Sequence, residues 1–158
     1  MKVTDRTRIN IHPERAVPEE AVEILSAGMV AHVGIVEGNQ PLVIPLSYHY
    51  DPSKPDLLYL HGGVKSRIMA NLANGAPVCV TVTLLDGLVY SRKAMNHSMN
   101  YRSVVLLGKA RAISSRQEKF DLFDQMVQRY FKDRTLETDY NPPPAADLAA
   151  TALVEVTI

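Results

Sequence analysis

The sequence predicts a mainly β protein, an antiparallel barrel with peripheral helices. Segments with the apolar alternation of strands follow one another along the chain, separated by turns rich in Gly, Pro, Asn and Asp. Helical patterns are inserted between these strands and do not alternate with them one for one. This order disfavours a doubly wound parallel sheet. Because no repeat or interdomain linker is evident, a single domain over residues 1–158 is expected.

The first half of the chain predicts a short helix followed by three strands. The helix begins at Pro18, has acidic residues in its first turn, and ends before Gly28. The strand segments are residues 30–36, 42–50 and 56–63, of which the first two form a hairpin. Pro45 cannot donate a backbone hydrogen bond, so the second strand is expected to be at a sheet edge or bulged there.

The second half predicts further strands and two or three more helices. A long helix begins at Ser115, where Glu118 completes a capping box, and its apolar residues form one stripe. Residues 92–100 are expected to be irregular. The remaining helical segments are residues 64–75 and 142–151, the latter either a turn or a short helix, and the strands are residues 77–86, 88–91, 101–114 and 152–158.

Composition limits the class of protein. The chain has 158 residues, 46% of them hydrophobic, and a formal net charge of zero, which is typical of a globular domain and disfavours nucleic-acid binding. No apolar run is long enough to span a membrane, and the charged N-terminus does not resemble a signal peptide. A cytoplasmic protein is therefore expected. The lone Cys79 lies in an apolar alternating run, and we expect it to be a buried small hydrophobe.

A phosphate site is suggested where the third strand meets the next helix, in LHGGVKSRIM. Gly62 and Gly63 allow a close approach of the backbone to a ligand. Lys65, Ser66 and Arg67 add a cation, a hydroxyl and a planar guanidinium, which together suit a phosphate monoester. The alternative is a helix cap with solvated charges. The glycine spacing matches neither a dinucleotide fingerprint nor a P-loop.

Two weaker candidate ligand contacts lie elsewhere. Asn100, Tyr101, Arg102 and Ser103 cluster where a polar stretch enters a long strand, and Arg102 could bind a phosphate or form a surface ion pair. The segment LVIPLSY could present backbone groups at Pro45 to a flat heterocycle.

The five histidines do not form a recognisable metal motif. His12 is expected on the surface, His32 in the sheet, and His49 at a strand end; His61 precedes the two glycines, and His97 lies in the polar stretch. None of them has HxH or HxxxH spacing, and the sequence has no GxSxG elbow of a hydrolase.

Three segments taken together resemble the flavin-binding relatives of pyridoxamine 5'-phosphate oxidase, and most closely the branch that includes the nitroimidazole-resistance proteins. They are VIPLSYHYD, LYLHGGVKSRIMANLANGAPVCVTVTLLDGLV and HSMNYRSVVLLGKA. The resemblance implies a split β-barrel and a homodimer with FMN at the subunit interface. It places Val43, Ile44, Pro45 and Leu46 beside the flavin ring, His61, Gly62, Lys65, Ser66 and Arg67 at the ribityl-phosphate end, and Asn100, Tyr101, Arg102 and Ser103 at the rest of the site.

The function that this resemblance implies is an FMN-dependent oxidoreductase acting on a small nitroaromatic- or quinone-like molecule. The alternatives are a flavin carrier or sensor without turnover, and a haem-binding split barrel in which a histidine binds iron. Oxidation of a vitamin B6 phosphate is disfavoured, since Arg92 and Lys93 are expected to be solvated and no second basic cluster is evident. Relatives usually continue past the position of Ile158 with a basic segment, so its contacts to substrate are expected to be missing.

Overall fold

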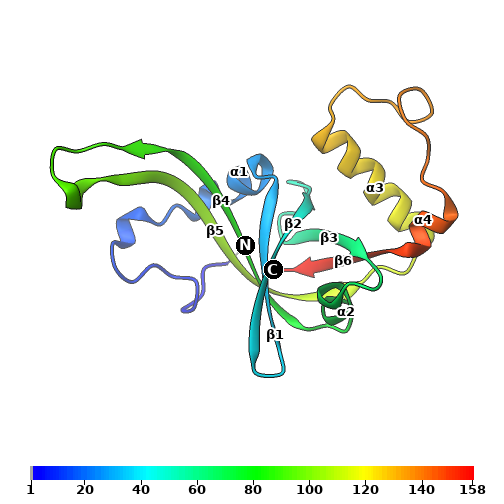
Figure 1. Ribbon diagram of the computed structural model, residues 1–158, viewed down its shortest axis with the longest axis horizontal. Coiled ribbons are helices and arrows are strands. Elements are labelled where there is room, and N and C mark those ends of the chain that lie inside the picture. Colours follow the sequence, from blue (N-terminus) through cyan, green and yellow to red (C-terminus); the bar gives the residue numbers. More distant parts are fainter. Residues whose placement is uncertain (1) are drawn as a thin grey trace.

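The computed structural model describes residues 2–158, which form six antiparallel strands closed into a barrel in the order β1-β2-β3-β6-β5-β4. The predicted fold class is confirmed. The strands are β1 (Val30–Glu37), β2 (Gln40–Tyr50), β3 (Leu57–Gly63), β4 (Pro77–Val89), β5 (Ser98–Ala112) and β6 (Thr151–Thr157). Figure 1 shows the helices on the outside of this barrel.

The helices cover different parts of the barrel. They are α1 (Ala21–Ala27), α2 (Arg67–Ala73), α3 (Arg116–Tyr130) and α4 (Ala145–Ala150), with short 3-10 turns at Pro13–Arg15, Pro18–Glu20 and Ala94–Asn96. The predicted cap of α3 is confirmed, because the Ser115 hydroxyl accepts a hydrogen bond from the Glu118 amide at 3.3 Å. None of the helices in residues 2–158 is long and apolar enough to cross a bilayer.

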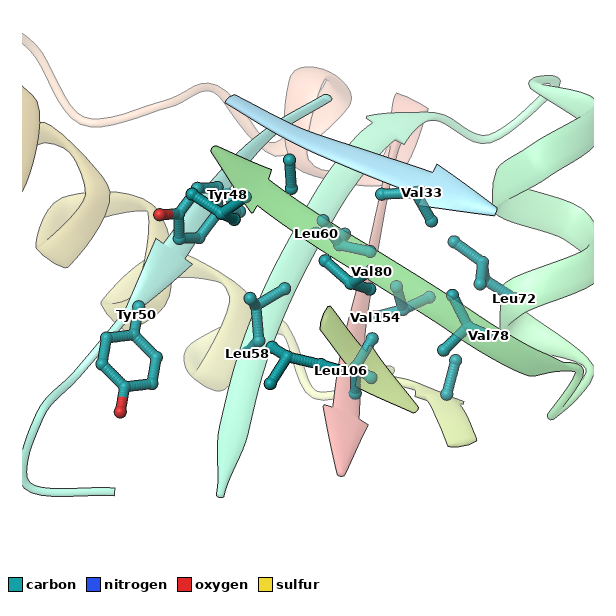
Figure 2. Close-up of a cluster of buried hydrophobic side chains, with 14 of the residues drawn as sticks. Val33, Tyr48, Tyr50, Leu58, Leu60, Leu72, Val78, Val80, Leu106 and Val154 are labelled. Carbon is teal, nitrogen blue, oxygen red and sulfur yellow. The ribbon is translucent and has the colours of Figure 1, made fainter. Parts of the chain in front are cut away.

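Strand alternation divides the apolar side chains between two clusters. Leu58 and Leu60 of β3 point into the barrel, where they meet side chains from the other strands and from α2 (Figure 2). Tyr59, between them, points outward and packs with Leu122 and Met126 beneath α3. The outer face of β3 is therefore the surface on which α3 rests.

The hairpin of β4 and β5 extends away from the barrel as a long arm (Figure 1). The sequence predicted a break after Asp86 and an irregular stretch over residues 92–100, and both predictions were wrong in part. The strand β4 continues to Val89 through a bulge between Leu85 and Gly87, and β5 already begins at Ser98. A bulge accommodates one extra residue without ending the pairing, which is why the turn-like Asp-Gly pair did not end the strand.

The prediction for Pro45 is confirmed, and the prediction for Cys79 is not. Pro45 does lie at an edge, since β2 pairs with β1 over residues 40–47 but meets β3 only over residues 48–50. The prediction for Cys79 was wrong, because its side chain is only half-buried. It alternates with the buried Val78 and Val80 and so points to the outer face of β4.

Candidate functional site

The junction between β3 and α2 exposes Lys65 and Arg67 of the predicted phosphate site and leaves Ser66 half-buried. The helix begins at Arg67, and Ser66 precedes it without using its hydroxyl as a cap. Lys65 is exposed and forms no ion pair within the described residues. Arg67 lies 3.4 Å from Glu37, Nη1 to Oε2. The junction thus presents one hydroxyl and one cation without partners, and a second cation already shared with a carboxylate.

Neither glycine of this junction has the left-handed backbone conformation that favours glycine. Gly62 lies close to a side chain of α2, and Gly63 borders open space. A Cβ at Gly62 would lie 2.9 Å from the Met69 Cγ atom, so a larger residue here would force the Met69 side chain of α2 to shift. A Cβ at Gly63 would meet nothing within 4 Å. Only Gly63 therefore leaves open space beside Lys65 and Ser66.

The predicted flavin-ring segment presents only half of its side chains to the outside. Ile44 and Leu46 pack against the barrel core. Val43 and Pro45 alternate with them and are exposed. Because no strand in the described part of the chain pairs with the other side of β2 over residues 40–47, its backbone edge is open there, as the sequence led us to expect.

The side chains of the four residues from Asn100 to Ser103 do not point toward one common site. They are consecutive in β5, so Tyr101 and Ser103 face one side of the arm while Asn100 and Arg102 face the other. Arg102 donates from Nε and Nη2 to Asp86 at 3.2 and 3.1 Å and from Nη1 to Glu23 at 2.9 Å. The hydrogen bonds to Asp86 raise the pKa of the Arg102 guanidinium.

Arg67 and Arg102 belong to opposite sides of the barrel within one chain. Arg102 is tied to α1 through Glu23, and Figure 1 shows α1 and α2 at opposite sides of the barrel. One chain alone therefore does not bring both guanidiniums to the same phosphate.

A large apolar pocket lies between α3 and the barrel, and the sequence did not predict it. Its volume is about 620 Å³. Its walls come from the start of β1, the outer face of β2 and β3, α3, and the segment that follows α3. The lining residues are Met29, Val30, Ser47, His61, Phe120, Phe123, Asp124, Met126, Val127, Tyr130, Phe131, Leu136, Tyr140, Asn141 and Pro143.

His61 belongs to this pocket. It lies on the outer face of β3 with Tyr59, and its ring meets Phe123 edge-on with 5.5 Å between ring centroids. The Nδ1 atom is buried and has no hydrogen-bond partner. Burial lowers the pKa of His61, so the ring is neutral near pH 7. The period-two alternation of β3 could have located His61 beside Tyr59, but only the packing of α3 creates the pocket.

Arg129 fixes the wall of the pocket that α3 provides. Its guanidinium donates to the backbone oxygens of Tyr48, Leu25 and Gly28 at 2.8, 2.8 and 2.7 Å. It also lies 4.5 Å above the Tyr48 ring centroid. These bonds join the end of α3 to β2 and to the end of α1, and so attach this end of the helix to the barrel.

The far wall of the pocket is held to α3 by polar contacts. Tyr140 donates a short hydrogen bond to Asp124, and Gln128 donates to the Tyr140 hydroxyl at 3.1 Å and to the Arg134 carbonyl at 2.7 Å. Among the described residues that line the pocket, Asp124 is the one carboxylate and there is no lysine or arginine. Within residues 2–158, no cluster of three or more His, Cys, Asp or Glu side chains is placed to hold a metal ion.

Comparison with known proteins assigns the chain to a family. The family model described as pyridoxamine 5'-phosphate oxidase matches residues 18–158. The chain therefore belongs to the pyridoxamine 5'-phosphate oxidase family, as its resemblance indicated. A comparison with curated protein sequences gave no significant match.

Two solved structures are similar over most of the chain. The flavocytochrome Anf3 from Azotobacter vinelandii is 32% identical with a TM-score of 0.84, covering 98% of this chain and 71% of that one. The FAD and haem binding protein from Mycobacterium smegmatis is 30% identical with a TM-score of 0.79, covering 90% of this chain and 66% of that one. The chain thus spans about two-thirds of each relative. A protein from Bacteroides thetaiotaomicron, named for 5-nitroimidazole antibiotic resistance, shares the fold at 23% identity and a TM-score of 0.66.

Proposed function

We propose that this protein is a dimeric, FMN-dependent oxidoreductase that reduces a small organic molecule. The observation that carries the proposal is the group of Lys65, Ser66 and Arg67 at the β3–α2 junction, with both cations exposed and Ser66 half-buried, in a member of this family. A dianionic phosphate needs several donors to offset its desolvation. Lys65 and the unused Ser66 hydroxyl supply two, and Arg67 supplies a third by leaving Glu37.

The residues present fit a flavin. The open edge of β2, with Val43 and Pro45 exposed, offers backbone groups and a flat apolar surface to the ring system. When bound, FMN supplies the electron transfer, while the chain binds and orients it. One similar protein is named for FAD binding. In this chain the candidate phosphate-binding side chains form one compact group at residues 65–67, which favours FMN with its single phosphate.

Calorimetry with FMN, FAD and riboflavin tests the flavin proposal. FMN is expected to bind most tightly, because riboflavin has no phosphate and FAD must place a second one. Equal affinity for riboflavin and FMN would remove the support for a phosphate site at residues 65–67. Oxidation of NAD(P)H in the presence of nitroaromatics or quinones then separates an enzyme from a flavin carrier or sensor.

A homodimer is part of this proposal. The outer face of the β4–β5 arm carries an apolar stripe of Leu85, Leu88, Met99 and Tyr101, between 53% and 63% exposed. The register pairs Leu85 with Tyr101 and Leu88 with Met99, and the bulge at Asp86 keeps both pairs on one face. A second copy of the chain would cover this stripe and remove its apolar surface from water.

Haem is a second candidate ligand, favoured by the α3 pocket. His61 faces an apolar pocket large enough for a sizeable flat ligand, its Nδ1 is buried without a partner, and a neutral histidine is a usual ligand of haem iron. Both similar structures are named for a cytochrome or for haem. His61 would hold the iron, and the apolar side chains of α3 would contact the ring. Because no cation lines the pocket, the haem carboxylates would remain in solvent.

Titration with haemin, followed by its Soret band, tests this candidate. The wild type is expected to give a shifted Soret band that His61→Ala loses and that added imidazole partly restores. His97→Ala removes an exposed histidine on the arm and serves as the matched control. An unshifted band in the wild type, or a band that survives in His61→Ala, would exclude His61 as the iron ligand.

A further inference from the structure

We infer that Glu37 sets the selectivity of the phosphate site between FMN and FAD, by repelling a dianionic phosphate more than a monoanionic one. This inference rests on the proposed phosphate site at Lys65, Ser66 and Arg67. Glu37 ends β1, and its side chain reaches Arg67 across the surface of the barrel.

Glu37 is fixed in place by α2. Its Oε1 atom accepts a hydrogen bond from Asn71 Nδ2 at 3.1 Å, and its Oε2 atom lies 3.4 Å from Arg67 Nη1. Asn71 Nδ2 also donates to the Arg67 carbonyl at 3.0 Å. When Arg67 turns to a phosphate, Asn71 therefore still holds the carboxylate beside the site.

A carboxylate in this position opposes phosphate binding. It has no hydrogen to donate to a phosphate oxygen, and it occupies one of the two cations of the site. The Arg67–Glu37 contact is long, and the Arg67 side chain is 66% exposed, so it contributes little to fixing the guanidinium in advance. Repulsion is then its main effect on a bound anion.

The repulsion depends on the charge of the phosphate. The monoester of FMN carries close to two negative charges at pH 7, whereas each phosphate of the FAD pyrophosphate carries one. The cost that Glu37 imposes is therefore larger for FMN than for FAD. Replacing Glu37 by an uncharged residue of the same shape is expected to shift the preference toward FMN.

Calorimetry on Glu37→Gln with FMN, FAD and riboflavin tests the inference. The amide oxygen of Gln can still accept from Asn71, so the fold should be kept. FMN affinity is expected to rise about fivefold, FAD affinity about twofold, and riboflavin affinity not at all. Glu19→Gln removes an exposed carboxylate elsewhere and controls for net charge.

The outcomes separate this inference from the proposed function. If Arg67→Ala leaves FMN affinity unchanged, the phosphate site itself is wrong. If Arg67→Ala weakens FMN binding while Glu37→Gln weakens it or has no effect, only the role of Glu37 is wrong, and a weakening would show that Glu37 positions Arg67. An equal gain for FMN and FAD would also overturn the inference.

Discussion

At the scale of single residues, Arg67 tests the phosphate site most directly. Arg67→Ala is expected to weaken FMN binding about tenfold, since a hydrogen bond to a charged group contributes roughly 1.5–3 kcal/mol. Riboflavin binding should not change. Arg67→Lys should recover only part of the loss, because the forked geometry of the guanidinium is absent. Calorimetry measures all three, and Arg116→Ala, an exposed arginine at the start of α3, is the matched control.

Sequence reasoning found candidate residues but not the faces on which they lie. Asn100 to Ser103 were grouped because they are adjacent in the chain, and strand geometry sends their side chains to opposite sides. The partners of Arg102 were also hidden. Its ion-pair partner Glu23 is 79 residues away in the sequence, and only the folding of the barrel brings the two residues together.

At the scale of elements, the β4–β5 arm is where we expect two chains to meet. Leu88→Asp places a charge in the middle of the apolar stripe, and burying it against a partner would leave it unpaired. At low micromolar concentration we expect the variant to be monomeric and the wild type to be dimeric, as measured by light scattering. Val36→Asp changes an equally exposed valine on the β1–β2 hairpin and should remain dimeric. A dimeric Leu88→Asp protein would place the interface elsewhere.

Helix α3 depends on Arg129 for its attachment to the barrel. Arg129→Met keeps much of the apolar stem but leaves the backbone oxygens of Leu25, Gly28 and Tyr48 without their charged donor. We expect a loss of about 3 kcal/mol in the free energy of unfolding. Denaturation by urea measures it, with Arg116→Met as a control on the same helix. A loss below about 1 kcal/mol would mean that water replaces these bonds at little cost.

The elements themselves were largely predictable, and their junctions were not. The stripe and cap of α3 and the alternation of β4 are local signals that the structure confirms. The arm was divided in the sequence-based prediction because Asp86-Gly87 has the composition of a turn. A turn and a bulge use the same residue types, and only the pairing partner distinguishes them. The α3 pocket was missed for a similar reason, since it forms between elements far apart in sequence.

At the scale of the whole molecule, the buried His49 and the half-buried His61 make stability depend on pH. Burial lowers the pKa of His49 and of His61 below the usual 6.5, and the positive charge of Arg129 adds to the effect on His49 against the opposing influence of Asp51. The unfolded chain then binds protons that the folded chain does not. The contribution of these two histidines to the free energy of unfolding is therefore fully present above about pH 6.5 and is lost as the pH falls below that value.

Thermal unfolding across pH 5 to 8 checks this dependence. His49→Phe should unfold with a flatter pH profile below pH 6.5, since its ring can still pack against Tyr59 without taking up a proton. His97→Ala, which changes an exposed histidine, should keep the wild-type profile. A wild-type melting temperature that stays constant between pH 5 and 7 would contradict the expectation.

The open edge of β2 has a consequence for the aggregation of this protein at high concentration. An unpaired strand edge is a template for adding strands from other molecules, which leads to aggregation. Over residues 40–47 that edge carries Pro41 and Pro45, and a proline cannot offer the amide hydrogen that an incoming strand needs. The same stretch that leaves its backbone available to a small flat molecule thus discourages a growing fibril. The eight residues from 40 to 47 thus combine an edge that is open to a ligand with prolines that limit aggregation.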